Sequence, residues 1–182
     1  MMKRDFRQWA VAALFVAISA FISGAQEKAQ RHKELPNFHQ VNERLYRGGQ
    51  PKTGGLELLA TMGVKTILNL RGAGEGTNGE EAKARALGMQ FVSLPMPNVG
   101  RPTDEQIARA LEILDDPANT PVFVHCKRGA DRTGVLIAAY RIKREGWTDR
   151  QAIEEANRHG MGMIQFRKRD FLSDYYKEQK RE

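Results

Sequence analysis

A polar, glycine-containing segment between two apolar runs constrains this chain of 182 residues more than any other part of its sequence. It reads His125-Cys-Lys-Arg-Gly-Ala-Asp-Arg-Thr-Gly134, follows the apolar run Pro121–Val124 and precedes a helical pattern. A strand that ends at His125, a short loop and a helix that begins near Arg132 would turn successive backbone N–H groups toward the point at which the helix N-terminus is aimed. The spacing therefore predicts a phosphate-binding loop with Cys126, the only cysteine, at its base.

Cys126 and Arg132 have the chemistry of a nucleophile and a phosphate ligand. A free thiol has a pKa of about 8.5, which a helix N-terminus and a nearby guanidinium can lower to roughly 3.5–7.5, so Cys126 is expected to be a thiolate at neutral pH. The planar guanidinium of Arg132 can hold two phosphate oxygens and follow them as the phosphorus becomes trigonal bipyramidal. The Thr133 hydroxyl could donate a hydrogen bond to the sulfur when it leaves in the second step.

Further residues in or beside this segment are candidates for substrate binding. Gly129 permits the tight turn, and His125 is expected to orient the loop through its ring nitrogens. Lys127 and Arg128 would either bind a second phosphate group or point outward as solvated charges. Arg71 would be a substrate clamp or a structural ion-pair partner. The substrate-binding candidates are His125, Lys127, Arg128, Gly129, Ala130, Gly134 and Arg71.

The segment resembles the signature of the cysteine-based protein phosphatases, which is His-Cys-x5-Arg followed by Thr or Ser and then Gly. The matching residues are His125, Cys126, Gly129, Arg132, Thr133 and Gly134. The less specific stretches Leu45–Pro51 (LYRGGQP) and Thr66–Arg71 (TILNLR) are similar to one branch of that family, the bacterial exported dual-specificity-type phosphatases and their atypical fungal and plant relatives. The resemblance covers roughly residues 37–178.

The resemblance implies metal-independent hydrolysis of phosphomonoesters through a phosphocysteine, most directly by a protein tyrosine or dual-specificity phosphatase without a cofactor. One alternative is a phosphatase of inositol polyphosphates or other small polyphosphates, because Lys127 and Arg128 add cations and the fungal and plant relatives have a similar Cys-Lys-x-Gly loop. Another is a weakly active phosphate-binding module. The combination of Cys126, Arg132 and Thr133 argues against the module, since binding alone does not need a thiol.

The proton donor for the leaving group is the open point of this mechanism. In the family an aspartate on an upstream loop usually donates this proton, but the corresponding stretch Leu94–Pro102 contains no acid. The candidates are Asp104, which would also complement a helix dipole, and Asp131 beside Arg132, which would also stabilise the loop. A missing acid favours phenol leaving groups, because a phenol needs less acid help than an alkyl alcohol.

The pattern of apolar residues, glycines and caps predicts a single α/β domain with a mainly parallel sheet covered by helices on both faces. The resemblance implies that this is the protein tyrosine phosphatase-like fold. Strands are expected at 38–41, 45–47, 64–70, 90–94 and 121–125, and helices at 55–62, 79–87, 103–114, 133–145, from 148 onward, and 165–177. Capping boxes are expected at Thr103 with Gln106 and at Thr148 with Gln151. The last helix carries an apolar stripe that we expect in the core, namely Phe166, Phe171, Leu172 and Tyr175.

The N-terminus has the composition of a secretory signal peptide. Basic residues precede the uncharged run Trp9–Ile22, and small residues end at Ala25. We expect a signal peptide at 1–25, a linker at 26–36 and the catalytic domain at 37–182, which implies export, in bacteria to the periplasm. The alternative is a membrane anchor formed by the uncleaved segment.

The net charge of +7 suits acidic phosphorylated substrates, which a basic surface steers toward the site. The partner is expected to be a phosphorylated protein or a small polyphosphate. Nucleic acid is not expected as a partner, because the basic residues are not interleaved with aromatic ones. No metal is expected, since the Cys and His residues lack metal-ligand spacing. We also expect a monomer.

Overall fold

The structure is a computed structural model that describes residues 32–72, 74, 79–162 and 164–181. These residues belong to one compact unit that begins at His32. Its strands are β1 (His39–Asn42), β2 (Leu45–Gly49), β3 (Thr66–Asn69), β4 (Gln90–Ser93) and β5 (Val122–Cys126). Its helices are α2 (Gly55–Thr61), α3 (Glu80–Ala86), α4 (Asp104–Asp115), α5 (Asp131–Glu145), α6 (Asp149–Arg158) and α7 (Phe166–Gln179).

The five strands form one sheet in the order β1-β2-β5-β3-β4. Only β1 runs antiparallel to its neighbour, so the predicted mainly parallel sheet is confirmed. Strand β5 lies in the centre between β2 and β3, and its last residue, Cys126, is paired with Gly49. The predicted nucleophile therefore stands at the carboxyl edge of the central strand, where α/β sheets bind ligands.

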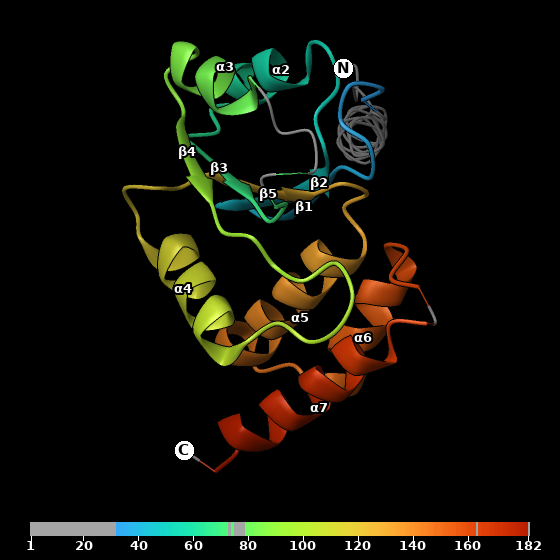
Figure 1. The fold of residues 1–182 in the computed structure, drawn as a ribbon. Coiled ribbons are helices and arrows are strands. Elements are labelled where there is room, and N and C mark those ends of the chain that lie inside the picture. Colours follow the sequence, from blue (N-terminus) through green and yellow to red (C-terminus); the bar gives the residue numbers. More distant parts are fainter. Residues whose placement is uncertain (1–31, 73, 75–78, 163, 182) are drawn as a thin grey trace, which may run out of the picture. The chain divides into compact units, whose positions relative to one another are not determined.

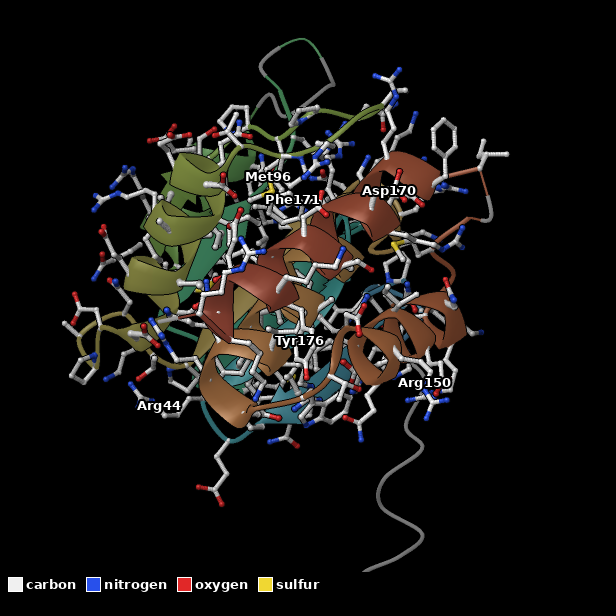
Figure 2. All side chains as sticks on the ribbon, turned by 90° about the horizontal axis from the view of Figure 1, so that it is seen from below. Arg44, Met96, Arg150, Asp170, Phe171 and Tyr176 are labelled. Carbon is white, nitrogen blue, oxygen red and sulfur yellow. The ribbon has the colours of Figure 1, made fainter. Side chains whose placement is uncertain are left out.

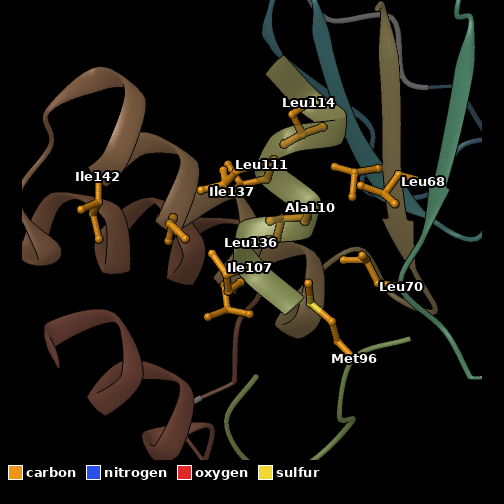
Figure 3. Packing of buried hydrophobic residues seen from close by; sticks show 14 of the residues in the cluster. Leu68, Leu70, Met96, Ile107, Ala110, Leu111, Leu114, Leu136, Ile137 and Ile142 are labelled. Atoms are coloured by element: carbon orange, nitrogen blue, oxygen red, sulfur yellow. The ribbon is translucent and has the colours of Figure 1, made fainter. Parts of the chain in front are cut away.

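Helices cover both faces of the sheet, with α2 and α3 on one face and α4 to α7 on the other (Figure 1). Alternate strand residues point to opposite faces, so Ile67 and Phe123 join a cluster with Leu59 of α2. Leu68 and Val124 join the larger cluster on the other side. Figure 3 shows the centre of this cluster, where Ile107, Ala110, Leu111 and Leu114 of α4 meet Leu68, Leu136 and Ile137.

The expected boundaries hold with small shifts, and both capping boxes are present, at Thr103 and Thr148. Helix α5 begins at Asp131, two residues before the predicted start. The prediction for Phe166 was wrong, because this first residue of α7 is exposed while Phe171 is buried. Five residues of α-helix separate the two, which places their side chains about 140° apart around the axis.

The domain begins earlier in the chain than predicted. Leu35 is buried against α2, and the carbonyl of Pro36 accepts a 2.7 Å hydrogen bond from the Gly49 N–H, so the end of the expected linker packs on the sheet. The expected signal peptide at 1–25 and the expected linker up to residue 31 lie outside the described residues. No helix among the described residues is long and apolar enough to span a bilayer.

The end of β2 and the loop after β5 approach each other closely, backbone against backbone. Gly129 has φ +70°, and a Cβ there would lie 2.3 Å from the Gly48 carbonyl carbon and 2.5 Å from the Gly49 nitrogen. A Cβ on Gly49 would lie 3.1 Å from the Arg128 carbonyl carbon. The glycines of the LYRGGQP stretch thus let the loop rest directly on the neighbouring strand.

We expect Gly129→Ala to destabilise the protein by on the order of 3 kcal/mol, because it adds a strained φ and a backbone clash. The matched control is Gly134→Ala inside α5. A Cβ there would meet the Ala156 Cβ at 3.5 Å, an ordinary contact, so this variant should gain about 0.5–1 kcal/mol from helix propensity. Urea unfolding of both variants measures the difference. Equal stability of the two would contradict the proposed close approach.

Candidate active site

The loop Lys127–Ala130 is held from outside by its carbonyl oxygens. The Lys127 carbonyl accepts from the Gln50 N–H at 3.3 Å, and Asn37 Nδ2 donates to the carbonyls of Arg128 (3.3 Å) and Gly129 (3.0 Å). In a trans peptide the C=O and the following N–H point in opposite directions. The outward carbonyls therefore turn the N–H groups of residues 128–130 toward the inside of the loop, as an anion site requires.

Arg47 supplies a further outer contact from β2. Arg47 is 1% exposed, and its Nη2 donates to the Gly129 carbonyl at 3.0 Å. Burial lowers the pKa of Arg47 to about 10, against the opposing charges of Glu155 and Cys126, so Arg47 remains a cation at neutral pH. Arg47 was not among the predicted site residues, although an arginine inside a short strand next to two glycines was a usable signal.

Cys126 is 3% exposed at the base of the loop. Burial alone would raise the pKa of its thiol. The hydroxyl and N–H of Thr133, the Arg132 guanidinium and the Gly129 N–H outweigh this effect and lower the pKa below its ordinary value. The Thr133 hydroxyl is buried and faces Sγ, although its geometry falls short of a conventional hydrogen bond. The thiol is thus prepared to ionise.

Arg132 lies in the first turn of α5 and is 3% exposed. Its Nη1 donates to the carbonyl of Leu70, at the end of β3, over 3.4 Å. This contact fixes the guanidinium on the inner side of the loop, where it lowers the pKa of Cys126. The structure thus brings Cys126, Arg132 and Thr133 together, as the Cys-x5-Arg-Thr spacing predicts.

A buried polar chain supports the cysteine from the other side. His125 Nδ1 lies 3.4 Å from the Cys126 carbonyl, and its Nε2 lies 2.9 Å from Glu80 Oε1. Glu80 Oε2 accepts from Gln50 Nε2 at 2.8 Å, and Gln50 Oε1 accepts in turn from Arg71. Burial would raise the pKa of the Glu80 carboxyl, but His125, Gln50 and Arg71 hold it below its usual range. Glu80 and Gln50 were absent from our candidates.

The two cations after Cys126 differ in their surroundings. The Lys127 side chain is exposed. The Arg128 side chain is 67% exposed, and its Nη2 lies 2.5 Å from Asp131 Oδ2. The other oxygen of Asp131 accepts from the Gly162 N–H at 3.0 Å. Both carboxylate oxygens are therefore engaged, and the observed role of Asp131 is to tie the start of α5 to the segment after α6.

The loop between β4 and α4, yellow-green in Figure 1, carries no carboxylate and is anchored by a buried lysine. Lys168 of α7 is 1% exposed, and its Nζ donates to the carbonyls of Asn98 (3.0 Å) and Gly100 (3.1 Å) and to Gln165 Oε1 (3.0 Å). Met96 of this loop shares a cluster with Phe171 of α7, next to which it lies in Figure 2. The other acid candidate, Asp104, is exposed as the first residue of α4, after this loop.

Two histidines contact each other near the phosphate-binding loop, and Asn37 bonds to the carbonyls of both His159 and the loop residue Gly129. The rings of His39 and His159 lie 4.2 Å apart, and the His159 carbonyl accepts from Asn37 Nδ2 at 2.9 Å. Burial, together with the charges of Arg47, His39 and Arg158, lowers the pKa of His159 to about 4, against the opposing effect of Glu155. This pair therefore stays neutral at physiological pH. In the part of the chain that the structure describes, no three His, Cys, Asp or Glu side chains form a candidate metal site.

Comparisons with a family model and with individual proteins all match this chain to phosphatases. The model of a family described as DSP-PTPase phosphatase fused to NAD+ kinase matches residues 15–174. The dual specificity protein phosphatase TpbA of Pseudomonas aeruginosa is 32% identical over 127 residues, which are 69% of this chain and 56% of that protein. The chain thus spans little more than half of TpbA. An inositol diphosphatase of Arabidopsis thaliana, DSP5, is 28% identical over 149 residues, 77% of this chain and 70% of that protein.

Solved structures agree in fold. The core catalytic domain of the PP-IP phosphatase SIW14 from S. cerevisiae, in complex with citrate, superposes with a TM-score of 0.70 at 27% identity, covering 80% of this chain and 88% of that one. The crystal structure of P. aeruginosa TpbA superposes with a TM-score of 0.63 at 26% identity, covering 80% and 91%.

The contact between Thr133 and the sulfur predicts that Thr133→Val raises the pKa of the Cys126 thiol, because the variant keeps the side-chain volume but loses the hydroxyl donor. The pH dependence of the rate of alkylation by iodoacetate measures this pKa. Thr133→Ser keeps the hydroxyl and should titrate like the parent protein. An unchanged profile in Thr133→Val would show that the hydroxyl does not stabilise the thiolate.

The histidine pair predicts an acid-dependent loss of stability. Between pH 6.5, the ordinary pKa of histidine, and about 4, the unfolded chain binds a proton at His159 that the folded protein does not bind. The free energy of unfolding should therefore fall as the pH falls through this window. His159→Gln should show a shallower fall in urea titrations at pH 7, 6, 5 and 4. Parallel curves for the two proteins would contradict the neutral state of the half-buried His159.

Proposed function

The chain belongs to the DSP-PTPase family of cysteine-based phosphatases, and we propose that it hydrolyses phosphomonoesters through a phosphocysteine, with phosphotyrosine and other aryl phosphates as its preferred substrates. The observation that carries the proposal is a buried thiol of lowered pKa beneath inward N–H groups and the Arg132 guanidinium. Simple binding of phosphate does not need this thiol, so we rank a weakly active binding module last.

In the first step the Cys126 thiolate attacks phosphorus in line with the leaving oxygen. The S–P bond forms, the P–O bond breaks, and its electron pair leaves on the alkoxide or phenoxide. The Arg132 guanidinium and the loop N–H groups bind the three equatorial phosphoryl oxygens. These oxygens move into one plane around phosphorus in the transition state. Arg47 and Asn37 contribute indirectly, because they hold the loop carbonyls away from this charge.

In the second step water attacks the phosphocysteine. The P–O bond to water forms, the S–P bond breaks, and Cys126 leaves as a thiolate while inorganic phosphate takes the remaining proton. The groups that lower the pKa of the free thiol also stabilise it as a leaving group. The Thr133 hydroxyl faces the sulfur at this point.

The surroundings of the acid candidates support an aryl leaving group. Both oxygens of Asp131 are engaged by Arg128 and Gly162, and the loop at 94–102 contains no carboxylate. A tyrosine phenol has a pKa of about 10, well below that of a serine hydroxyl, so it can depart with little proton transfer. An alkyl phosphate would lose the factor of about 10²–10⁴ that a general acid supplies.

A second candidate function is hydrolysis of inositol polyphosphates or similar small polyphosphates. It is favoured by the exposed Lys127 at the loop and by the similarity to the Arabidopsis inositol diphosphatase and to SIW14. Arg128 contributes less to this candidate than its position in the sequence suggests, because it is paired with Asp131.

We further propose that the protein is exported, in bacteria to the periplasm, or is anchored in the membrane by its N-terminal segment. The support is the basic start, the apolar run Trp9–Ile22 and the small residues up to Ala25. A monomeric state is proposed as well. Mass spectrometry of the N-terminus of the protein recovered from cells, and light scattering of the purified protein, test these points.

The decisive experiment compares turnover of p-nitrophenyl phosphate, a phosphotyrosine peptide, a phosphoserine peptide and inositol hexakisphosphate in the presence of EDTA. We expect kcat/KM for the phosphotyrosine peptide to exceed that for the phosphoserine peptide by at least about 10²-fold, the lower limit for general-acid help. Cys126→Ser should abolish all turnover.

The matched control for the acid is Asp104→Asn, which we expect to leave kcat on the phosphotyrosine peptide within about threefold, since loss of a general acid would cost about 10²–10⁴. A loss of that size would instead identify Asp104 as the donor. Preferential hydrolysis of inositol hexakisphosphate would replace the leading proposal with the second candidate.

A further inference from the structure

Three large hydrophobic side chains are exposed in the part of the chain that the structure describes. Val99 is 79% exposed, Ile164 is 84% exposed and Phe166 is 59% exposed. Val99 lies on the loop between β4 and α4, and the other two lie at the turn into α7. Exposed apolar side chains that gather at one place usually mark a binding surface. We refer to these three residues as the apolar rim.

The hydrogen bonds of Lys168 bring the two parts of the apolar rim together. Lys168 Nζ binds the carbonyls on either side of Val99, those of Asn98 and Gly100. The same atom binds Oε1 of Gln165, the residue between Ile164 and Phe166. All three rim residues are therefore direct chain neighbours of groups that converge on one buried ammonium.

Contacts of the segment after α6 place the rim beside the phosphate-binding loop. A Cβ on Gly160 would lie 3.7 Å from the Ala130 Cβ, and a Cβ on Gly162 would lie 3.9 Å from both Asp131 Oδ1 and Ile164 Cγ1. The charge of Cys126 also acts on Lys168. The part of the rim at Ile164 thus lies next to the first residues of α5, close to the loop that would bind the phosphate.

Exposed apolar side chains, rather than charges, distinguish this face. Lys168 at its centre is 1% exposed with three oxygen acceptors. Of the arginines that flank the rim, Arg101 is paired with Asp174 at 3.0 Å, and Arg167, next to Phe166, is exposed. The Lys127 side chain is exposed, and its carbonyl accepts from the Gln50 N–H just after β2.

We infer that the apolar rim binds a large apolar side chain next to the phosphotyrosine of a protein substrate, and that Val99, Ile164 and Phe166 determine specificity for such sequences. This inference rests on the proposed function and deepens it. A protein segment suits the rim better than a bilayer, because the phosphate of a bound peptide in the loop would place the residues next to its phosphotyrosine near Asp131 and Ile164, which both approach Gly162.

The test measures binding in the full-length Cys126→Ser protein, so that it does not depend on turnover. Two phosphotyrosine pentapeptides are titrated by calorimetry, one with leucine and one with serine on both sides of the phosphotyrosine. We expect the leucine peptide to bind on the order of tenfold more tightly, the usual effect of one apolar group in a matching site. Adding Phe166→Ser or Ile164→Ser should remove most of this preference, while Phe166→Leu should retain it.

Equal affinity for the two peptides, or a preference that survives both serine substitutions, would overturn the inference. Sedimentation with vesicles of phosphatidylcholine and phosphatidylglycerol is run in parallel. Vesicle binding that is lost in Phe166→Ser, without a change in peptide preference, would assign the rim to a membrane surface and would also overturn it. Absence of Cys126-dependent turnover on p-nitrophenyl phosphate would instead refute the proposed function, which this binding measurement does not assume.

Discussion

The site depends on the outward direction of three consecutive carbonyl groups. The backbone of Gln50 and the side chains of Asn37 and Arg47 hold the carbonyls of residues 127–129, and the N–H groups on the inside follow from peptide planarity. This arrangement requires the loop to lie directly on β2, which is possible only because Gly129 meets the backbone of Gly48 without a side chain between them. The geometry of the anion site is therefore determined mainly by a neighbouring strand.

The parts of the site that are local in sequence were predictable, and the parts that depend on distant residues were not. Cys126, Arg132 and Thr133 lie on one loop and one helical turn, so their spacing alone brings them together. Glu80, Asn37 and Lys168 reach the site from other elements. Their side chains look like ordinary surface charges or amides until the fold buries them, because a charge pattern does not identify a partner far away in the chain.

Much of the fold could be predicted from the periodicity of the apolar residues and from the glycines and capping residues that bound the helices and strands. The alternating strands and helices, both capping boxes and the parallel sheet were expected. The errors came where tertiary contacts outweigh local pattern. Phe166 belongs to an apolar pattern but begins its helix on the exposed side, and Leu35 lies in a polar stretch but packs under α2. The helical angle between Phe166 and Phe171 could have corrected the first error. Nothing local indicated the second.

The buried cations around the loop couple the stability of the domain to its ligand. Arg47, Arg132 and Lys168 are each at most 3% exposed, and burial of charge is unfavourable unless opposite charge compensates it. A bound phosphate dianion supplies such charge in the folded state alone, so it shifts the folding equilibrium by RT ln(1 + [L]/Kd). Phosphate bound in the loop would therefore raise the free energy of unfolding, by an amount that grows with the concentration of free phosphate.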